Sequence, residues 1–307
     1  MLVEPLDCKA LWPHNPCTQP HHHFKSRLPA RHHAHHKGSF GSVLVAGGAP
    51  GMVGAAILAA RTAVLTGAGR VAVAPLQAFA PDWFDPHFPE LMHKPLHQGL
   101  AFASVLAVGT GLGTCAQAQA VLAECLQHAT ECFPKNTAGN SSTNTRIQPM
   151  VLDADALNLI ATHPHLRQKL AACPAPVVLT PHPLEAARLT GLTTQRVREQ
   201  RIAVATDLAN EFNAVVVLKG AGTVVTNGHT TLINHTGGPA LATAGSGDVL
   251  TGAIASFLAQ GLDALNAAGV AVWLHGYCIS AQSQPILVSH ASELAQRMKR
   301  ELEVCRG

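Results

Sequence analysis

The sequence predicts an α/β protein with a mostly parallel central sheet and helices on both of its faces. Short apolar runs alternate with longer helix-like segments, which is the βαβ order of a parallel sheet. Most of these runs are apolar at every position, as in strands that are covered on both sides. Apolar residues make up 47% of the 307 residues and charged residues only 13%. A chain of this length and composition can bury a substantial core.

The elements follow one another as strand, turn and helix from residue 42 onward. Glycine turns at 47–51 and 109–113 each follow a predicted strand, and Gly67 and Gly69 end the first helix. Strands are predicted at 43–46, 71–74, 105–108, 150–152, 177–179 and 215–218. Helices are predicted at 53–65, from the second glycine turn through Leu126, and at about 246–260, 263–283 and 290–304.

A hairpin is predicted after the strand at 215–218. Two β-branched runs, 223–226 and 230–233, flank the dipeptide Asn227-Gly228, which is typical of a type I′ turn. The polar stretch at 130–148 is predicted to be a surface loop, because it is rich in Asn, Ser, Thr and Gly.

The first 36 residues are rich in Pro and His and show no periodicity. The histidines at 21–23 and 32–36 could chelate a metal, but no carboxylate or cysteine accompanies them at a fixed spacing. We therefore expect a flexible leader over 1–36 and a single catalytic domain over 37–307.

Composition excludes several classes of partner. The net charge of +3 is too small to indicate a nucleic-acid partner. No apolar run reaches the roughly 18 residues of a membrane span, and the first residues do not resemble a secretory signal. The eight cysteines form no C-x-x-C pair, so they are expected to be reduced core residues of a cytoplasmic protein.

The strongest functional signal is Gly245-Ser246-Gly247-Asp248 at the start of an apolar helix. Glycines let successive N–H groups converge on one anion, and the helix N-terminus adds roughly half a positive charge. A carboxylate beside an anion hole is costly unless it acts as a base on a hydroxyl that is to be phosphorylated. The alternative is an ordinary N-capping aspartate. The pattern favours Asp248 as a catalytic base in an enzyme that acts on a nucleotide.

Further polar residues follow the predicted strands, where ligands of parallel sheets bind. Asp153, His182 and Lys219 all occupy such positions. Lys219 and its flanking glycines suit a phosphate, although the lysine could also cap a solvated strand end. Asp155 is a plausible helix cap, whereas Asp153 could reach the substrate.

The segment 180–185 carries two prolines that fix the backbone and present His182 and Glu185 at a strand tip. Glu185 could order Mg²⁺ beside a phosphate, or it could answer the helix dipole. The turn at 47–51 does not match G-x-G-x-x-G, which disfavours a Rossmann NAD site.

Five segments, taken in order, resemble those of the ADP/ATP-dependent NAD(P)H-hydrate dehydratases. They are residues 36–41, 151–158, 179–185, 217–223 and 238–252, and with 109–113 they cover about residues 36–280. This family belongs to the ribokinase-like superfamily, so the resemblance implies a ribokinase-like fold. It also implies a repair reaction in which the S epimer of hydrated NADH or NADPH is dehydrated at the expense of ADP or ATP, with Mg²⁺.

The resemblance further implies roles for individual residues. Asp248 would contact the hydrated ring and deprotonate its hydroxyl. The positions that match the hydrate site are Ala55, Gly111, His182 and Asp248. The positions that match the adenine-nucleotide site are Lys219, Gly220, Ala221, Gly222, Thr223, Gly245, Ser246 and Gly247. The position of Glu185 at the strand tip, and not the resemblance, makes it the expected magnesium ligand.

The chain departs from the family pattern in two places. Gly238 stands where members often have asparagine, and Leu241 where they often have methionine. After His275-Gly276 the usual Ala-Gly-Asp is replaced, beginning with Tyr277. Many relatives carry an N-terminal epimerase domain, and because only about 35 residues precede the match, we expect this chain to lack that activity. The resemblance therefore implies a separate epimerase acting on the same pool, and a homotetramer, as is common in the family.

Two other functions are compatible with the same residues. A ribokinase-like vitamin-precursor kinase would use Asp248 and the same turn, but would release a stable phosphorylated product. A non-catalytic nucleotide-binding relative would be consistent with the altered positions Gly238 and Tyr277.

Overall fold

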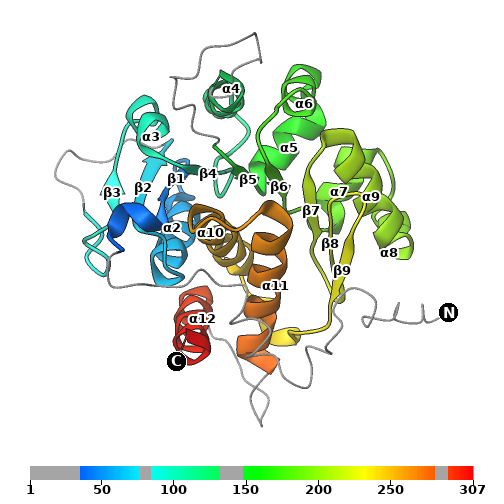
Figure 1. Cartoon of the computed structure of the whole chain (residues 1–307). Coiled ribbons are helices and arrows are strands. Elements are labelled where there is room, and N and C mark those ends of the chain that lie inside the picture. The colour runs from blue at the N-terminus through cyan, green and yellow to red at the C-terminus, as the bar shows by residue number, and fades with distance from the viewer. Residues whose placement is uncertain (1–34, 77–83, 132–147, 281–289, 307) are drawn as a thin grey trace, which may run out of the picture.

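The computed structural model describes residues 35–76, 84–131, 148–280 and 290–306. Their centre is one nine-stranded sheet in the order β3-β2-β1-β4-β5-β6-β7-β8-β9. Neighbouring strands from β3 to β7 are parallel, and β8 and β9 form an antiparallel hairpin at one edge. Helices cover both faces of the sheet (Figure 1). The predicted mostly parallel α/β architecture is confirmed.

The strands are short and lie where the apolar runs predict them. Their bounds are β1 Ser42–Gly47, β2 Arg70–Pro75, β3 Met92–His93, β4 Val105–Val108, β5 Met150–Leu152, β6 Val177–Leu179, β7 Val215–Leu218, β8 Thr223–Thr226 and β9 Thr231–Asn234. Only β3 has no counterpart among the predicted strands. It has two residues, too few for a periodic signal.

The helices divide between the two faces of the sheet. On one face lie α2 (Val53–Leu65), α10 (Ser246–Ala259), α11 (Ala264–Ser280) and α12 (Ala291–Arg306). The other face is covered by α3 (Leu96–Phe102), α4 (Ala116–Glu131), α5 (Asp155–Thr162), α6 (Pro164–Ala171), α7 (Pro183–Thr190), α8 (Thr194–Glu199) and α9 (Arg201–Phe212). Two short 3₁₀ helices, η2 (Lys37–Phe40) and η3 (Pro239–Leu241), complete the elements. The predicted 53–65 helix coincides with α2, and α4 runs five residues beyond Leu126.

Every strand except β3 and β9 contributes buried residues to two separate cores. In β1, Val43 and Val45 pack toward α2 and α10, whereas Leu44 and Ala46 pack toward the opposite layer. All four side chains are buried. This is why the strand reads as a continuous apolar run, since neither of its faces meets water.

The prediction of a type I′ turn between β8 and β9 is wrong. Thr226 pairs with Thr231, so four residues connect the strands. The backbone φ angle is positive at Gly228 but not at Asn227, whereas a type I′ turn needs both. The Asn227 side-chain oxygen accepts hydrogen bonds from the N–H groups of His229 (3.0 Å) and Thr230 (2.7 Å), and thereby closes a longer loop.

Several predictions fall outside the described residues. The leader lies outside them except for His35 and His36. The division of the chain into a leader and a single catalytic domain stays a prediction. Most of the polar stretch at 130–148 is also outside, although Gln148 at its end is buried. Of the described cysteines, four are buried and Cys115 is exposed. No helix in the described part of the chain is long and apolar enough to cross a membrane.

Candidate functional site

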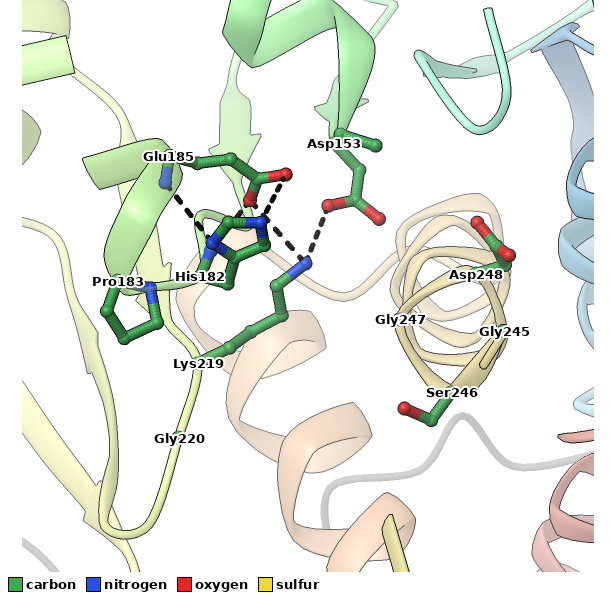
Figure 2. Close-up of a pocket in the computed structure, with 11 residues that line it drawn as sticks. Asp153, His182, Pro183, Glu185, Lys219, Gly220, Gly245, Ser246, Gly247 and Asp248 are labelled. Carbon is green, nitrogen blue, oxygen red and sulfur yellow. Dashed lines mark hydrogen bonds and ion pairs between the residues drawn. The ribbon is translucent and has the colours of Figure 1, made fainter. Parts of the chain in front are cut away.

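Polar residues converge where β5, β6 and β7 end and α10 begins (Figure 2). There a pocket of about 430 Å³ is lined by three carboxyl groups, those of Asp153, Glu185 and Asp248, together with Lys219. We call it the acidic pocket. The predicted convergence of Asp153, His182 and Lys219 at the carboxyl ends of the strands is confirmed, because all three line it.

Asp153 and Lys219 form an ion pair at the base of this pocket. The Lys219 ammonium donates to Asp153 Oδ1 at 2.8 Å, and the Thr251 hydroxyl donates to Oδ2 at 2.7 Å. Burial raises the pKa of Asp153, but the Lys219 charge and these hydrogen bonds outweigh it and hold the pKa below its usual value. The same pairing raises the pKa of Lys219 against the effect of burial. Lys219 is therefore a paired cation, and its alternative role as a solvated strand cap is excluded.

His182 and Glu185 form a reciprocal cap at the start of α7. His182 Nδ1 accepts from the N–H groups of Leu184 and Glu185, while Glu185 Oε2 accepts from the His182 N–H at 2.7 Å. Glu185 is buried and its Oε2 lies 3.9 Å from Lys219 Nζ. Burial raises the pKa of Glu185 to about 7, although Lys219 opposes the rise. Glu185 thus lies in the first turn of α7, where the helix-dipole alternative places it, and it also caps the helix. Its carboxyl nevertheless still lines the pocket.

Asp248 lies in the first turn of α10 and is not its N-cap. That position belongs to Gly245, whose φ of 87° is left-handed and whose missing Cβ would approach Leu58 Cδ2 to 2.6 Å. Among the described residues, no group donates a hydrogen bond to the Asp248 carboxyl. Burial, followed by repulsion from Asp153, raises the pKa of Asp248 to about 7. The N-capping alternative is thus excluded, and the carboxyl is a half-buried base poised near neutral pH.

A second pocket of about 560 Å³ lies on the other side of Lys219. It is lined by the loop 219–223, by residues 234–239 with Leu241 and Ala242, and by parts of α10 and α11. We call it the glycine pocket. Lys219, Gly220, Ser246 and Gly247 line both pockets, so these four residues form a shared wall. No Asp or Glu is among the described residues that line the glycine pocket.

His275 of α11 lines the glycine pocket, and sequence reasoning did not assign it a role. Its Nε2 lies 2.9 Å from the Ser246 carbonyl oxygen in the first turn of α10. Burial lowers the pKa of His275 to about 4. A neutral imidazole with its proton on Nε2 can donate to that carbonyl, and so ties α11 to the turn that carries Asp248.

Ala55 and Gly111 lie together, but neither is among the residues that line the two pockets. A Cβ at Gly111 would approach Ala55 Cβ to 3.1 Å. The interpretation of Asp155 as a helix cap is wrong. Asp155 begins α5, and its carboxylate accepts the Gly113 N–H at 2.8 Å, which ties the glycine turn after β4 to α5.

Comparison with known proteins gives a consistent result. The sequence model of the NAD(P)H-hydrate dehydratase family matches residues 43–300. The chain is 40% identical over 256 residues to the ADP-dependent (S)-NAD(P)H-hydrate dehydratase of Neisseria meningitidis, covering 82% of this chain and 81% of that one. It is 38% identical over 279 residues to the bifunctional NAD(P)H-hydrate repair enzyme of Moorella thermoacetica, covering 82% of this chain but 47% of the relative. The chain thus spans about half the length of the bifunctional relatives.

Solved structures agree with the sequence matches. The ADP/ATP-dependent NAD(P)H-hydrate dehydratase of Bacillus subtilis, co-crystallised with ATP and Mg²⁺, superposes with a TM-score of 0.73 at 27% identity, over 93% of this chain and 97% of that one. A ribokinase-like superfamily protein of Enterococcus faecalis superposes with a TM-score of 0.77 at 24% identity, over 94% and 95% of the two chains, which supports the fold alone. The chain has the ribokinase-like fold and belongs to the NAD(P)H-hydrate dehydratase family.

Proposed function

We propose that the protein dehydrates the S epimer of hydrated NADH or NADPH, with ADP or ATP as the phosphoryl donor. The observation that carries this proposal is Asp248, a half-buried carboxyl with a pKa raised to about 7 beside a glycine turn at a helix N-terminus. The proposal is also supported by the names of the relatives in Neisseria meningitidis and Bacillus subtilis.

In the acidic pocket Asp248 would remove the proton from the hydroxyl on carbon 6 of the hydrated nicotinamide ring. The oxygen would then attack the terminal phosphorus of the nucleotide. The leaving group would be AMP when the donor is ADP, and ADP when the donor is ATP. Hydroxide is a poor leaving group, whereas the resulting phosphate ester is a good one. The ring-nitrogen lone pair would expel it as phosphate, and loss of a ring proton would restore the double bond. A base with a pKa near 7 is suited to the first step.

The glycine pocket suits the adenine nucleotide because the side chains that line the pocket do not repel phosphate. Phosphate groups are repelled by carboxylates, and none lines this pocket among the described residues. The shared wall offers the Lys219 ammonium and the start of α10, both of which favour an anion. We propose that Lys219 to Thr223 and Gly245 to Gly247 hold the adenine nucleotide. Ala55, Gly111 and His182 would contact the hydrate.

A magnesium ion fits the donor set of the acidic pocket. Mg²⁺ is commonly held by one or two carboxylates together with substrate phosphates. Glu185 supplies a buried carboxyl that a nearby dication would favour in its charged form. The described residues contain no cluster of three or more His, Cys, Asp or Glu that could hold a metal alone. Glu185 would therefore hold the ion jointly with the nucleotide, and the ion would supply charge neutralisation for phosphoryl transfer.

We also propose that the enzyme acts in the cytoplasm as a homotetramer, on a pool that a separate epimerase supplies. Light scattering coupled to size-exclusion chromatography would measure the assembly. A monomer or a dimer at micromolar concentration would contradict the tetramer without affecting the proposed reaction.

The test is a coupled assay with the full chain, the S epimer of hydrated NADH, Mg²⁺ and either ADP or ATP. We expect reduced-nicotinamide absorbance to return together with stoichiometric nucleotide cleavage and phosphate release. The R epimer alone, as the matched control, should give no return. Accumulation of a stable phosphorylated product without that absorbance would instead show a kinase. If the nucleotide binds but is not consumed, the protein is a non-catalytic relative.

A further inference from the structure

Arg201 occupies a position that is electrostatically unfavourable for a cation. It is the first residue of α9, at the positive end of that helix, and it is only partly exposed. Burial lowers its pKa, and its Nε atom has no hydrogen-bond partner among the described residues. A guanidinium held in this way requires compensation from another part of the structure.

The compensation comes from the loop after β7. The Arg201 Nη2 group donates to the carbonyl oxygens of Leu218 at 2.8 Å, Lys219 at 3.3 Å and Gly222 at 3.3 Å. Leu218 ends β7, and Lys219 and Gly222 belong to the loop that lines the glycine pocket. Arg201 itself does not line either pocket, so it contacts this loop from behind.

The orientation of the carbonyl groups that Arg201 holds determines the orientation of the neighbouring N–H groups of the loop. In a trans peptide the N–H lies opposite the C=O, so the Gly220 N–H is directed away from Arg201 when the Lys219 carbonyl faces it. Among the described residues, no acceptor receives the N–H groups of Gly220, Ala221 or Gly222. Three consecutive N–H groups without an acceptor, at the wall of a pocket, are available to bind an anion.

The fit between Arg201 and Gly220 is tight. Gly220 has a φ of 137°, which side chains rarely allow, and a Cβ there would lie 3.0 Å from Arg201 Nη1. The guanidinium occupies the space that a side chain at Gly220 would need. The loop conformation and the position of the arginine therefore depend on each other.

We propose that Arg201 is a positioning residue that holds the loop 219–222 with its N–H groups directed at the nucleotide phosphates. It would act through the loop and would not touch the nucleotide. This inference rests on the proposed function, since it takes the glycine pocket to be the nucleotide site.

The test is calorimetric titration of ADP into the full chain and its Arg201→Gln variant, with Arg198→Gln as the matched control. Arg198 is exposed on α8, three residues earlier. We expect Arg201→Gln to weaken ADP binding by about tenfold or more, because it removes charge-assisted hydrogen bonds that fix the loop. Arg198→Gln should bind as the wild type does. In the coupled assay the Arg201→Gln change should raise the KM for nucleotide and leave kcat at saturating nucleotide within about twofold.

Two further measurements separate positioning from general stability. Arg201→Lys keeps the charge but not the fork, so we expect intermediate ADP affinity. For Arg201→Ala, millimolar guanidinium chloride should recover part of the lost affinity. If Arg201→Gln binds ADP within twofold of the wild type, or if kcat falls as much as nucleotide affinity, the inference is wrong. If the wild type itself binds neither ADP nor ATP, the proposed function fails first.

Discussion

The acidic pocket and the glycine pocket share a wall but are built from different chemistry. The first presents ionisable side chains, namely three carboxyls and one ammonium, and two of the carboxyls have a pKa raised to about 7. The second presents mainly backbone and small side chains, with no carboxyl among its described lining residues. Proton transfer needs groups that titrate near working pH, whereas phosphate binding needs fixed N–H groups and no competing anion. The difference implies a division of labour between the two pockets that Lys219 separates. The acidic pocket would transfer protons, and the glycine pocket would bind phosphate.

The largest expected effect is a loss of stability from Lys219→Met, which removes the charged side chain of the shared wall. The change would leave the buried Asp153 and Glu185 carboxyls without their cation, which typically costs about 3–5 kcal/mol. The Asp153 contribution is present above its unfolded pKa of 3.8 and is lost only as the pH falls through the lower folded value, so it is complete at pH 7. Urea unfolding at neutral pH would measure the loss.

The matched control for that variant is Lys299→Met. Its exposed pair with Glu303, 3.2 Å apart, should contribute less than about 1 kcal/mol. Equal losses for the two variants would show that the pair at the wall adds no more than an exposed one.

Asp248→Asn should separate the two pockets functionally. Removing a general base usually costs at least about 100-fold in turnover, while the glycine pocket should keep its affinity for ADP within about twofold. Steady-state assay and calorimetry on the same preparation would measure both quantities. A parallel loss of ADP affinity would contradict the division of labour.

The pH profile should identify the titrating group. Asp248 must be deprotonated to act as a base, so activity is lost as the pH falls through its raised pKa of about 7. Turnover should therefore fall about tenfold between pH 8 and pH 6. Because Glu185 has a similar pKa, Glu185→Gln is the discriminating control, and a glutamine can preserve the helix cap. If that variant lacks the acid limb, Glu185 and not Asp248 controls the rate.

The smallest effect is expected on the glycine side, from Gly238→Asn. Gly238 has extended backbone, and nothing lies within 4 Å of the Cβ that a side chain would add. The free energy of unfolding should change by no more than about 0.5 kcal/mol, and ADP binding should not weaken. Thermal unfolding and ADP titration would test this. A marked loss of either would show that the loop needs glycine there.

The meeting of strand-end residues could be predicted from sequence because the sheet geometry is general. Asp153, His182 and Lys219 each follow an apolar run, and parallel strands end at one edge. Thr251, His275 and Arg201 could not be found in this way. They lie on helices, and helical periodicity does not specify which loop a given side chain will meet. The hairpin itself was predicted correctly, but its turn type was not, because the dipeptide rule ignores the capping ability of the Asn227 side chain.

The wall common to both pockets links ligand binding to proton binding. A nucleotide that places its phosphates against Lys219 and Gly247 brings negative charge close to Asp248 and Glu185, whose pKa values already lie at about 7. Without Mg²⁺ that charge would raise both pKa values further, so we expect the entry of metal-free nucleotide to be accompanied by net proton uptake at neutral pH. By reciprocity, metal-free ADP should bind more tightly as the pH falls toward 6. Calorimetry in buffers of different ionisation enthalpy would measure the protons taken up.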